Sequence, residues 1–211
     1  MRRIVCLALM ALAAAPVPRP VLAQTGPSFD CAKAESAAEK AVCADPALAA
    51  MDRELARVYA LAAAKGDDSS LKAMQRGWIK GRDDCWKADD GVPACTRREY
   101  ALRIEEIRRG SAAARASEGA SLGPFPYVCD GFEPVVSAAF VNAGEPVVVL
   151  RWLDQAAVLP RAESGSGARY QGPTWAGPAE FWTKGTAEGD EATFLPPGAR
   201  AGVACRRDAT G

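Results

Sequence analysis

A serine and a lysine in the C-terminal third of the chain are the residues best placed for chemistry. Ser166 lies between Gly165 and Gly167, in a stretch with too many glycines for a helix or a packed strand. We expect an exposed loop presenting a hydroxyl that both donates and accepts hydrogen bonds. Lys184 follows an aromatic strand end, residues 181–183, and precedes a glycine turn. The two segments therefore offer a hydroxyl and an ammonium side by side on stiff supports.

Short apolar runs must position these two groups. Turns such as 142–144 and 197–198 separate runs of strand-forming residues, and many short strands at close spacing predict an antiparallel barrel or sandwich. The predicted strands are 126–129, 135–141, 147–153, 156–159, 168–170, 181–182, 192–195 and 201–205.

The motif residues also carry a family resemblance. They read Ser-Gly-Ser-Gly-Ala-Arg-Tyr at 164–170 and Phe-Trp-Thr-Lys-Gly at 181–185. This pair resembles the signature of the membrane-bound and periplasmic inhibitors of c-type lysozyme, the MliC/PliC family, over residues 127–205. The resemblance implies a barrel of about eight strands, and a Cys129–Cys205 bond would join its first strand to its last. Segment 171–180 is longer than the family pattern.

The resemblance implies a binding role without catalysis, metal or cofactor. A c-type lysozyme cleaves glycan with one protonated and one ionised carboxyl group. We expect Ser166 to hydrogen-bond the first and Lys184 to pair with the second, while Arg169 and Tyr170 brace the loop or contact its rim. The expected lysozyme-binding residues are Ser166, Lys184, Gly165, Gly167, Arg169, Tyr170 and Thr183.

Other interpretations of these residues remain open. Glycine and serine alone are typical of a flexible turn, and Ser166 with Lys184 would also suit a Ser–Lys hydrolase. The chain has no histidine for a conventional triad and no nucleophile elbow. The aromatic residues Tyr127, Trp152, Phe181 and Trp182 are expected in the barrel core, and Trp78 and Trp86 in the packing of the helical region. The acid pairs 83–84 and 89–90 are interpreted as solvated loop charge rather than a calcium or catalytic site.

Residues 29–110 show helical patterns. Asp45 and Pro46 predict a helix start, and apolar residues from Leu48 to Ala62 recur at helical spacing. Segment 67–70 suits the cap of a second helix with Leu71, Met74 and Trp78 on its apolar face. Segment 96–99 reads as a capping box that opens a third helix. We expect a helical hairpin or a three-helix unit.

The helical region has its own resemblance. The motifs at 29–34, 39–46, 75–79 and 82–85 resemble the LprI-type lysozyme-inhibitor domain, over nearly all of 29–109. Its four cysteines permit three pairings. We favour Cys31–Cys43 and Cys85–Cys95, because the members of each pair are close in sequence and flank a turn.

The N-terminus predicts export. Residues 1–23 begin with two arginines at positions 2 and 3, followed by a short apolar run and a small-residue cleavage site, as in a secretory signal peptide, and no lipobox cysteine follows. The run is too short to span a bilayer, so we expect no stable membrane anchor after cleavage. Six of the seven cysteines then remain, which implies disulfides in an oxidising compartment, the periplasm or beyond. The six cysteines are Cys31, Cys43, Cys85, Cys95, Cys129 and Cys205.

Charge gives a weaker indication of the partner. The signal removes three arginines and no acid from 26 basic and 26 acidic residues, so the mature chain is mildly acidic. This balance does not suit nucleic acid and suits a basic protein such as a c-type lysozyme. Ordinary solubility explains it equally well.

The sequence therefore predicts an α+β protein of separate domains. The expected parts are a signal peptide at 1–23, an LprI-like helical domain at 24–110, an Ala/Ser/Gly-rich linker at 111–124, an MliC/PliC-like barrel at 125–207 and a tail at 208–211. The predicted function is inhibition of c-type lysozyme by plugging its cleft. The main alternative is an envelope module that binds glycan or protein without inhibiting lysozyme.

Overall fold

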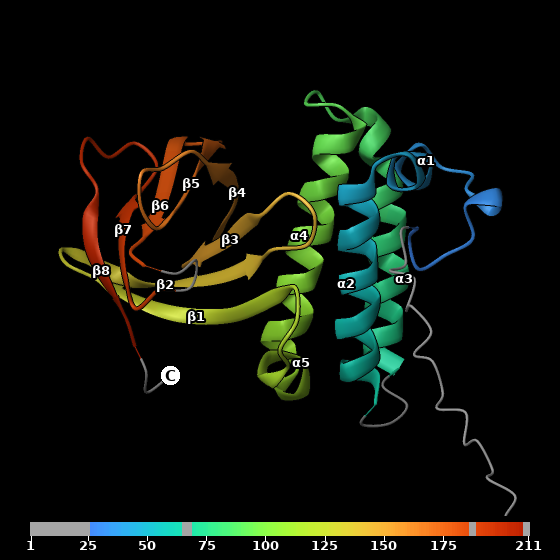
Figure 1. The fold of residues 1–211 in the computed structure, drawn as a ribbon, viewed down its shortest axis with the longest axis horizontal. Coiled ribbons are helices and arrows are strands. Elements are labelled where there is room, and N and C mark those ends of the chain that lie inside the picture. The colour runs from blue at the N-terminus through green and yellow to red at the C-terminus, as the bar shows by residue number, and fades with distance from the viewer. Residues whose placement is uncertain (1–25, 65–68, 186–188, 209–211) are drawn as a thin grey trace, which may run out of the picture.

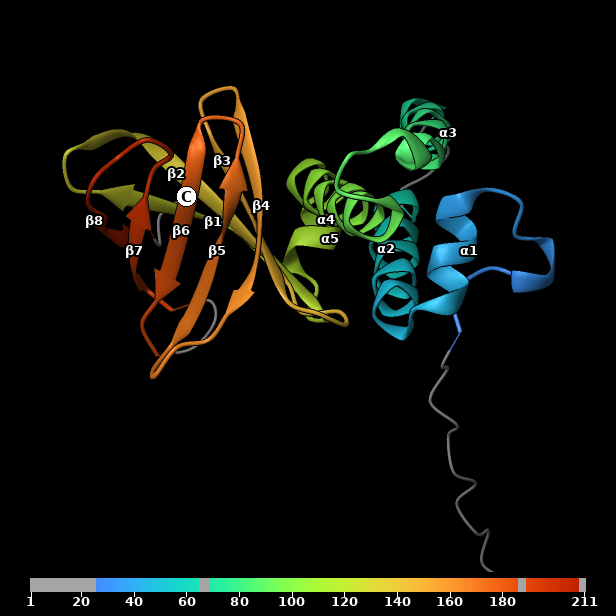
Figure 2. The ribbon, with the colours of Figure 1, turned by 90° about the horizontal axis from the view of Figure 1, so that it is seen from above.

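The computed structural model describes residues 26–64, 69–185 and 189–208. The expected signal peptide and nearly all of the expected tail lie outside these residues. A helical region and a β-barrel lie next to each other, with α4 between the barrel and the other long helices (Figures 1 and 2).

The helical region begins with short capped helices. Ser36 and Glu39 form a reciprocal capping box, and the Asp45 side chain accepts a hydrogen bond from Ala47 N at 2.8 Å. The elements are η1 (Cys31–Lys33), α1 (Ala37–Ala44), α2 (Pro46–Ala63), α3 (Ser69–Asp83), η2 (Asp84–Lys87), α4 (Val92–Gly110) and α5 (Ala112–Ala116).

The start of α4 differs from the prediction. The helix begins at Val92, and the expected capping residue Thr96 is fully buried inside it. Gly91 precedes the helix and Pro93 stands in its first turn, where a missing backbone N–H costs nothing. Trp86 also differs from expectation, because 64% of it is exposed rather than packed in the helical region.

Both predicted disulfides of the helical region are present, Cys31–Cys43 and Cys85–Cys95. The first joins η1 to α1, and the second joins η2 to the start of α4. Cross-links of this kind restrict the unfolded chain and compensate for a small core.

The barrel contains eight antiparallel strands in sequence order, as predicted. It closes where β1 pairs with β8, and there Cys129 lies directly opposite Cys205 and is bonded to it. The strands are β1 (Ser121–Cys129), β2 (Phe132–Val141), β3 (Val147–Trp152), β4 (Gln155–Ala162), β5 (Ala168–Thr174), β6 (Gly177–Thr183), β7 (Glu191–Leu195) and β8 (Val203–Arg207).

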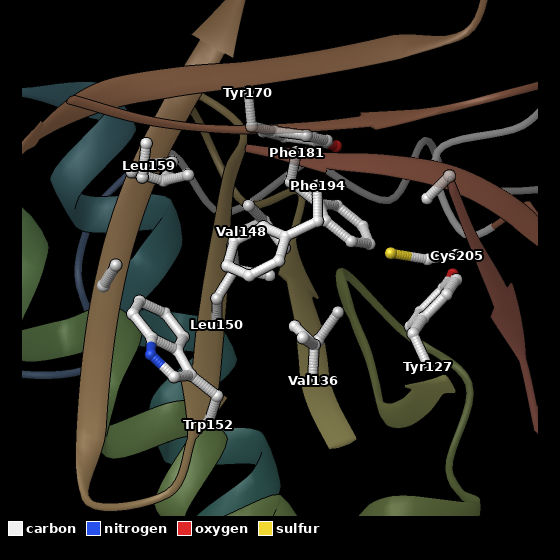
Figure 3. Packing of buried hydrophobic residues seen from close by; sticks show 14 of the residues in the cluster. Tyr127, Val136, Val148, Leu150, Trp152, Leu159, Tyr170, Phe181, Phe194 and Cys205 are labelled. Carbon is white, nitrogen blue, oxygen red and sulfur yellow. The ribbon is translucent and has the colours of Figure 1, made fainter. Parts of the chain in front are cut away.

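Aromatic side chains fill the barrel interior (Figure 3). Phe181 meets Tyr127 edge to face, with ring centroids 5.1 Å apart, and Trp152 packs on Phe194 at 5.4 Å. Edge contacts of this kind add to the stabilisation from burial alone. The expectation that Tyr127, Trp152 and Phe181 belong to the core is therefore confirmed.

The helices cover an outer face of the barrel. In β3 the run Val147–Leu150 is buried at every position instead of alternating, because both faces of the strand are covered. Val148 and Leu150 point into the barrel, whereas Val147 and Val149 share an apolar cluster with helix residues such as Leu55 and Ile104. The helical region and the barrel thus meet through a continuous core.

Polar groups in the same interface are paired. The carboxylate of Glu105, only 1% exposed on α4, accepts hydrogen bonds from Arg151 Nε at 2.6 Å and Arg109 Nε at 3.0 Å. Arg108 is equally buried and donates to the carbonyl of Gly123 at 2.8 Å. Burial lowers the pKa of Arg108. A buried charge is tolerated only with such partners, so these bonds specify how the two regions dock.

The stretch 111–124, expected to be a linker, has regular structure. It holds α5 and the first residues of β1, and Ser121 N donates to Glu54 on α2 at 3.0 Å. Its Ala/Ser/Gly composition suggested too little burial for order, but Ala114 and Ser121 are fully buried against neighbouring elements. In the part of the chain that the structure describes, no helix has the length and apolar character needed to cross a membrane.

The shared core predicts cooperative unfolding. Replacing the buried Val149 with alanine removes two methyl groups and should lower the free energy of unfolding by about 1.5–3 kcal/mol. Helix loss followed by far-ultraviolet circular dichroism and barrel loss followed by the amide NMR signals of the strands should both shift, in one common transition. Val135→Ala, at a position that is 52% exposed on β2, is the control and should change stability by less than about 0.5 kcal/mol. Two separate transitions would contradict a common core.

Candidate functional site

The Ser166 loop and Lys184 lie at the same end of one hairpin. Strands β5 and β6 pair so that Ala168 lies opposite Thr183 (Figure 2 shows the two strands side by side). Ser166 stands two residues before Ala168 and Lys184 one residue after Thr183. Strand pairing therefore brings together two residues that are far apart in sequence.

Gly167 makes the contact between the two segments. Its φ angle is +64°, and a Cβ placed on it would lie 2.0 Å from the carbonyl oxygen of Thr183 and 3.4 Å from Cα of Lys184. No side chain fits at such distances, and only glycine adopts this backbone angle without strain. The glycine allows the loop to pack directly on the backbone that carries the lysine.

The loop is held through its carbonyl groups. Trp182 Nε1 donates to the carbonyl of Ser166 at 2.9 Å, and Arg161 Nη2 donates to the carbonyl of Gly167 at 3.4 Å. Ser164 Oγ also donates to Gly167 at 3.2 Å. Ser166 is exposed, and among the described residues none bonds its hydroxyl. That hydroxyl can therefore bond a partner molecule.

Lys184 is exposed in an ion pair that it can exchange. Its Nζ lies 3.2 Å from Glu191 Oε2, and its backbone N–H donates to the carbonyl of Glu191 at 2.9 Å. The two side chains are 71% and 54% exposed. A surface pair of this kind contributes only about 0–1 kcal/mol, so a more buried carboxylate on a partner can replace Glu191.

Two predicted binding residues are buried instead of exposed. Tyr170 and Thr183 are both fully buried, and the Tyr170 ring packs on Phe140 inside the barrel at 5.8 Å. Tyr170 was expected to brace the loop or contact its rim, but strand alternation turns it inward. Neither residue offers its side chain to a partner, so any role in binding is to fix the backbone of the hairpin.

Arg169 and Trp182 form the outward face of the hairpin next to the loop. The Arg169 guanidinium bonds Glu180 Oε2 through Nη2 at 2.6 Å and Nε at 2.9 Å, and lies 5.8 Å from the centre of the Trp182 ring. The prediction that Trp182 lies in the core is wrong, because it is 36% exposed while its neighbours Phe181 and Thr183 are fully buried. The two-residue alternation of a strand would have indicated this.

The segment 171–180 extends the hairpin instead of forming an insert. Strand pairing continues to Thr174 opposite Gly177, and the chain reverses at Trp175 and Ala176. The additional residues therefore lie at the far end of the hairpin and leave the pairing of Ala168 with Thr183 unchanged.

Three of the four residues in the acid pairs, and Lys184, form ion pairs with neighbouring side chains. Asp83 and Asp84 form ion pairs with Arg82 and Lys87, and Asp90 pairs with Arg98. The described residues contain no group of three potential metal ligands. The carboxylate of Glu191 is the partner that the structure shows for the Lys184 ammonium.

A polar cluster in the helical region lies under a cleft of about 340 Å³. The Tyr100 hydroxyl donates to Asp52 Oδ1 at 2.9 Å and accepts from Arg82 Nη1 at 3.2 Å. Burial and the charge of Asp52 raise the pKa of Tyr100, so the hydroxyl stays protonated. Phe29 and Trp78 line the cleft. The polar groups below the cleft, Asp52, Arg82 and Tyr100, hydrogen-bond one another. These bonds account for their burial without a ligand.

Each of the two regions is similar to a known family. Residues 31–118 match the family model described as lysozyme inhibitor LprI. Residues 127–200, which include the Ser166 loop and Lys184, match the model described as membrane-bound lysozyme-inhibitor of c-type lysozyme, MliC. The two matches follow in the order expected from the sequence motifs. No curated protein and no solved structure matches the chain.

The close approach at Gly167 predicts unequal effects of two neighbouring substitutions. Gly167→Ala should lower the free energy of unfolding by about 2–3 kcal/mol, because the new Cβ meets the Thr183 carbonyl at a strained backbone angle. Gly165→Ala adds a Cβ with nothing within 4 Å and should leave stability unchanged or raise it by up to about 1 kcal/mol. Denaturant titration of both variants measures the difference, and equal stabilities would contradict the packing described.

Proposed function

Because the chain joins an LprI-type lysozyme-inhibitor region to an MliC-type region, we propose that it is an exported inhibitor of c-type lysozyme that inserts the Ser166 loop and Lys184 into the catalytic cleft. Both matched families are lysozyme inhibitors, which supports inhibition in general. The choice of these two residues as the plug is our proposal.

The chemistry of the target suits the two groups. A c-type lysozyme uses a protonated glutamic acid and an ionised aspartate on either side of the scissile bond. A serine hydroxyl can accept the proton of the neutral acid in a hydrogen bond, and a lysine ammonium can pair with the carboxylate. Ser166 and Lys184 would thus satisfy both carboxyl groups and exclude the substrate, with no covalent step.

The observation that carries the proposal is the contact of Gly167 with the backbone of Thr183 and Lys184. It places the hydroxyl-bearing loop and the cation next to each other on one rigid hairpin before any partner binds. Preorganised groups lose little conformational freedom on association, and this raises affinity. The exposed Lys184–Glu191 pair supports the proposal, since breaking it costs little.

The six bonded cysteines fit a location outside the cytoplasm. We place the protein in the periplasm or outside the cell, where it would protect cell-wall peptidoglycan from lysozyme. The cleft in the helical region, lined by Phe29, Tyr59 and Trp78, favours one alternative, an envelope module that binds glycan or protein there. Inhibition that survives loss of both Ser166 and Lys184 would support that alternative.

Substitution of the lysine tests the proposal. Lys184→Ala should weaken inhibition of c-type lysozyme by at least about tenfold, because it leaves a buried carboxylate in the complex without its partner. Ser166→Ala should weaken it less, since one neutral hydrogen bond is lost. The double variant should lose nearly all inhibition. The measurement is turnover of a cell-wall substrate at increasing inhibitor concentration.

Lys87→Ala is the matched control. Lys87 is likewise an exposed lysine in a surface ion pair, 2.8 Å from Asp84, but it lies in η2 of the helical region. Its substitution should leave the inhibition constant unchanged. An unchanged constant for Lys184→Ala, in a variant with wild-type thermal stability, would remove this lysine from the mechanism.

A further inference from the structure

We infer that Trp182 is a positioning residue for the Ser166 loop, and that Glu180 and Arg169 hold Trp182 in place. The inference rests on the proposed function as far as inhibition is concerned, but the positioning itself can be measured without lysozyme.

The Ser166 loop needs external support. Gly165 has nothing within 4 Å of the position of a Cβ, so the side of the loop before Ser166 is open. Gly167, on the other side, is wedged against Thr183. A serine between two glycines has little intrinsic conformational preference, so its hydroxyl is presented in one direction only if the surrounding structure fixes its backbone.

Trp182 supplies that support at the serine itself. Its indole Nε1 donates to the carbonyl of Ser166 at 2.9 Å, which is a normal hydrogen-bond length. The other two side-chain bonds to the loop, from Arg161 and Ser164, both end on the next carbonyl, that of Gly167. Among the described residues, Trp182 is thus the one side chain that fixes the peptide group of Ser166.

The position of Trp182 is in turn fixed by its neighbours on the same face of the sheet. Arg169 lies directly opposite Trp182 in the pairing of β5 with β6, and its guanidinium lies 5.8 Å from the ring centre. Glu180 holds that guanidinium with two short hydrogen bonds. Both of these bonds end on the same oxygen, Oε2. Cation–π contacts and charge-assisted hydrogen bonds both restrict orientation, so the indole N–H is directed at the loop.

The alternative is that Trp182 is an ordinary surface tryptophan with no role in positioning the Ser166 loop. The same hairpin provides the comparison: Trp175, at its far end, is 81% exposed and donates its N–H to Gln155 Oε1 at 2.8 Å. Both tryptophans donate one N–H bond of normal length at the surface. They differ in exposure, 81% for Trp175 and 36% for Trp182, and in that only the bond of Trp182 ends on the Ser166 loop.

The test compares Trp182→Phe with Trp175→Phe in the full chain. Each change keeps an aromatic ring and removes one N–H donor. Trp182→Phe should weaken inhibition of c-type lysozyme about three- to tenfold, the equivalent of one hydrogen bond. Trp175→Phe should leave inhibition within twofold of the wild type. Thermal unfolding should be shifted slightly more by Trp182→Phe, since Trp182 is the more buried of the two, so inhibition is compared at a temperature where both variants are fully folded.

A double-mutant cycle distinguishes positioning from general damage. If Trp182 acts through Ser166, then Trp182→Phe should cost little in a chain that already carries Ser166→Ala. Full additivity of the two changes would overturn the inference. Arg169→Met, which removes the guanidinium but keeps the length of the side chain, should weaken inhibition in the same direction by a smaller factor.

The rate of hydrogen exchange at the backbone amides of residues 165–168 measures the order of the Ser166 loop without lysozyme. Trp182→Phe should speed exchange in this loop several-fold, whereas Trp175→Phe should not. If the wild type fails to inhibit lysozyme, the proposed function is wrong, and the exchange comparison still decides whether Trp182 positions the loop. Equal exchange and equal inhibition in the two variants would overturn the inference.

Discussion

Strand β3 is buried on both faces, and this constraint links the two halves of the molecule. Its inner residues belong to the aromatic core of the barrel, while Val147 and Val149 on its outer face require cover that the barrel cannot supply. Helices α2 and α4 supply it, and the buried Glu105–Arg151 pair fixes their placement. The helical region is therefore a structural partner of the barrel as well as a domain with its own family match.

The candidate site depends on a different part of the barrel, the β5–β6 hairpin. Its inward residues, Tyr170, Phe181 and Thr183, are buried and anchor the strands, so the outward residues and the two ends are free to serve binding. The chemistry lies in short exposed groups, and their placement comes from the rigid sheet below. Helix α4 packs against β1, β2, β3 and β4, so the barrel carries the site on strands other than those that the helices cover.

Most of the fold could be predicted from the sequence. The positions of the eight strands and the pairs Cys31–Cys43 and Cys85–Cys95 follow from apolar runs, turn residues and cysteine spacing, because these signals are local. The closed barrel and the Cys129–Cys205 bond, which joins residues 76 apart, were expected from the family resemblance. The start of α4 was missed because Thr96 and Glu99 mimic a capping box, whereas Gly91 and Pro93 mark the actual start. The linker was misjudged because its order comes from contacts with α2 and α4, which composition does not reveal.

For the candidate site, the two segments could be predicted but the exposure of their side chains could not. Ser166 and Lys184 are exposed as expected, since glycines flank the one and a turn follows the other. Tyr170, expected to brace the loop or contact its rim, is fully buried, which rules out the rim contact, and Trp182, expected in the core, is partly exposed. Residue type favoured those assignments, and strand register decided against them, because each strand has a single inward-facing set of positions.

The extension of the hairpin at 171–180 has a consequence for variation among such barrels. Residues added in pairs at the Trp175 turn lengthen both strands together and leave Ala168 opposite Thr183, so the site is insulated from length changes at the far end. A single added residue in β6, between Gly177 and Thr183, would instead exchange the two faces of the strand. The turn at Trp175 and Ala176 is therefore a suitable place to graft a peptide tag or a fluorescent label, whereas an insertion next to Gly167 would disturb its packing on Thr183 and Lys184.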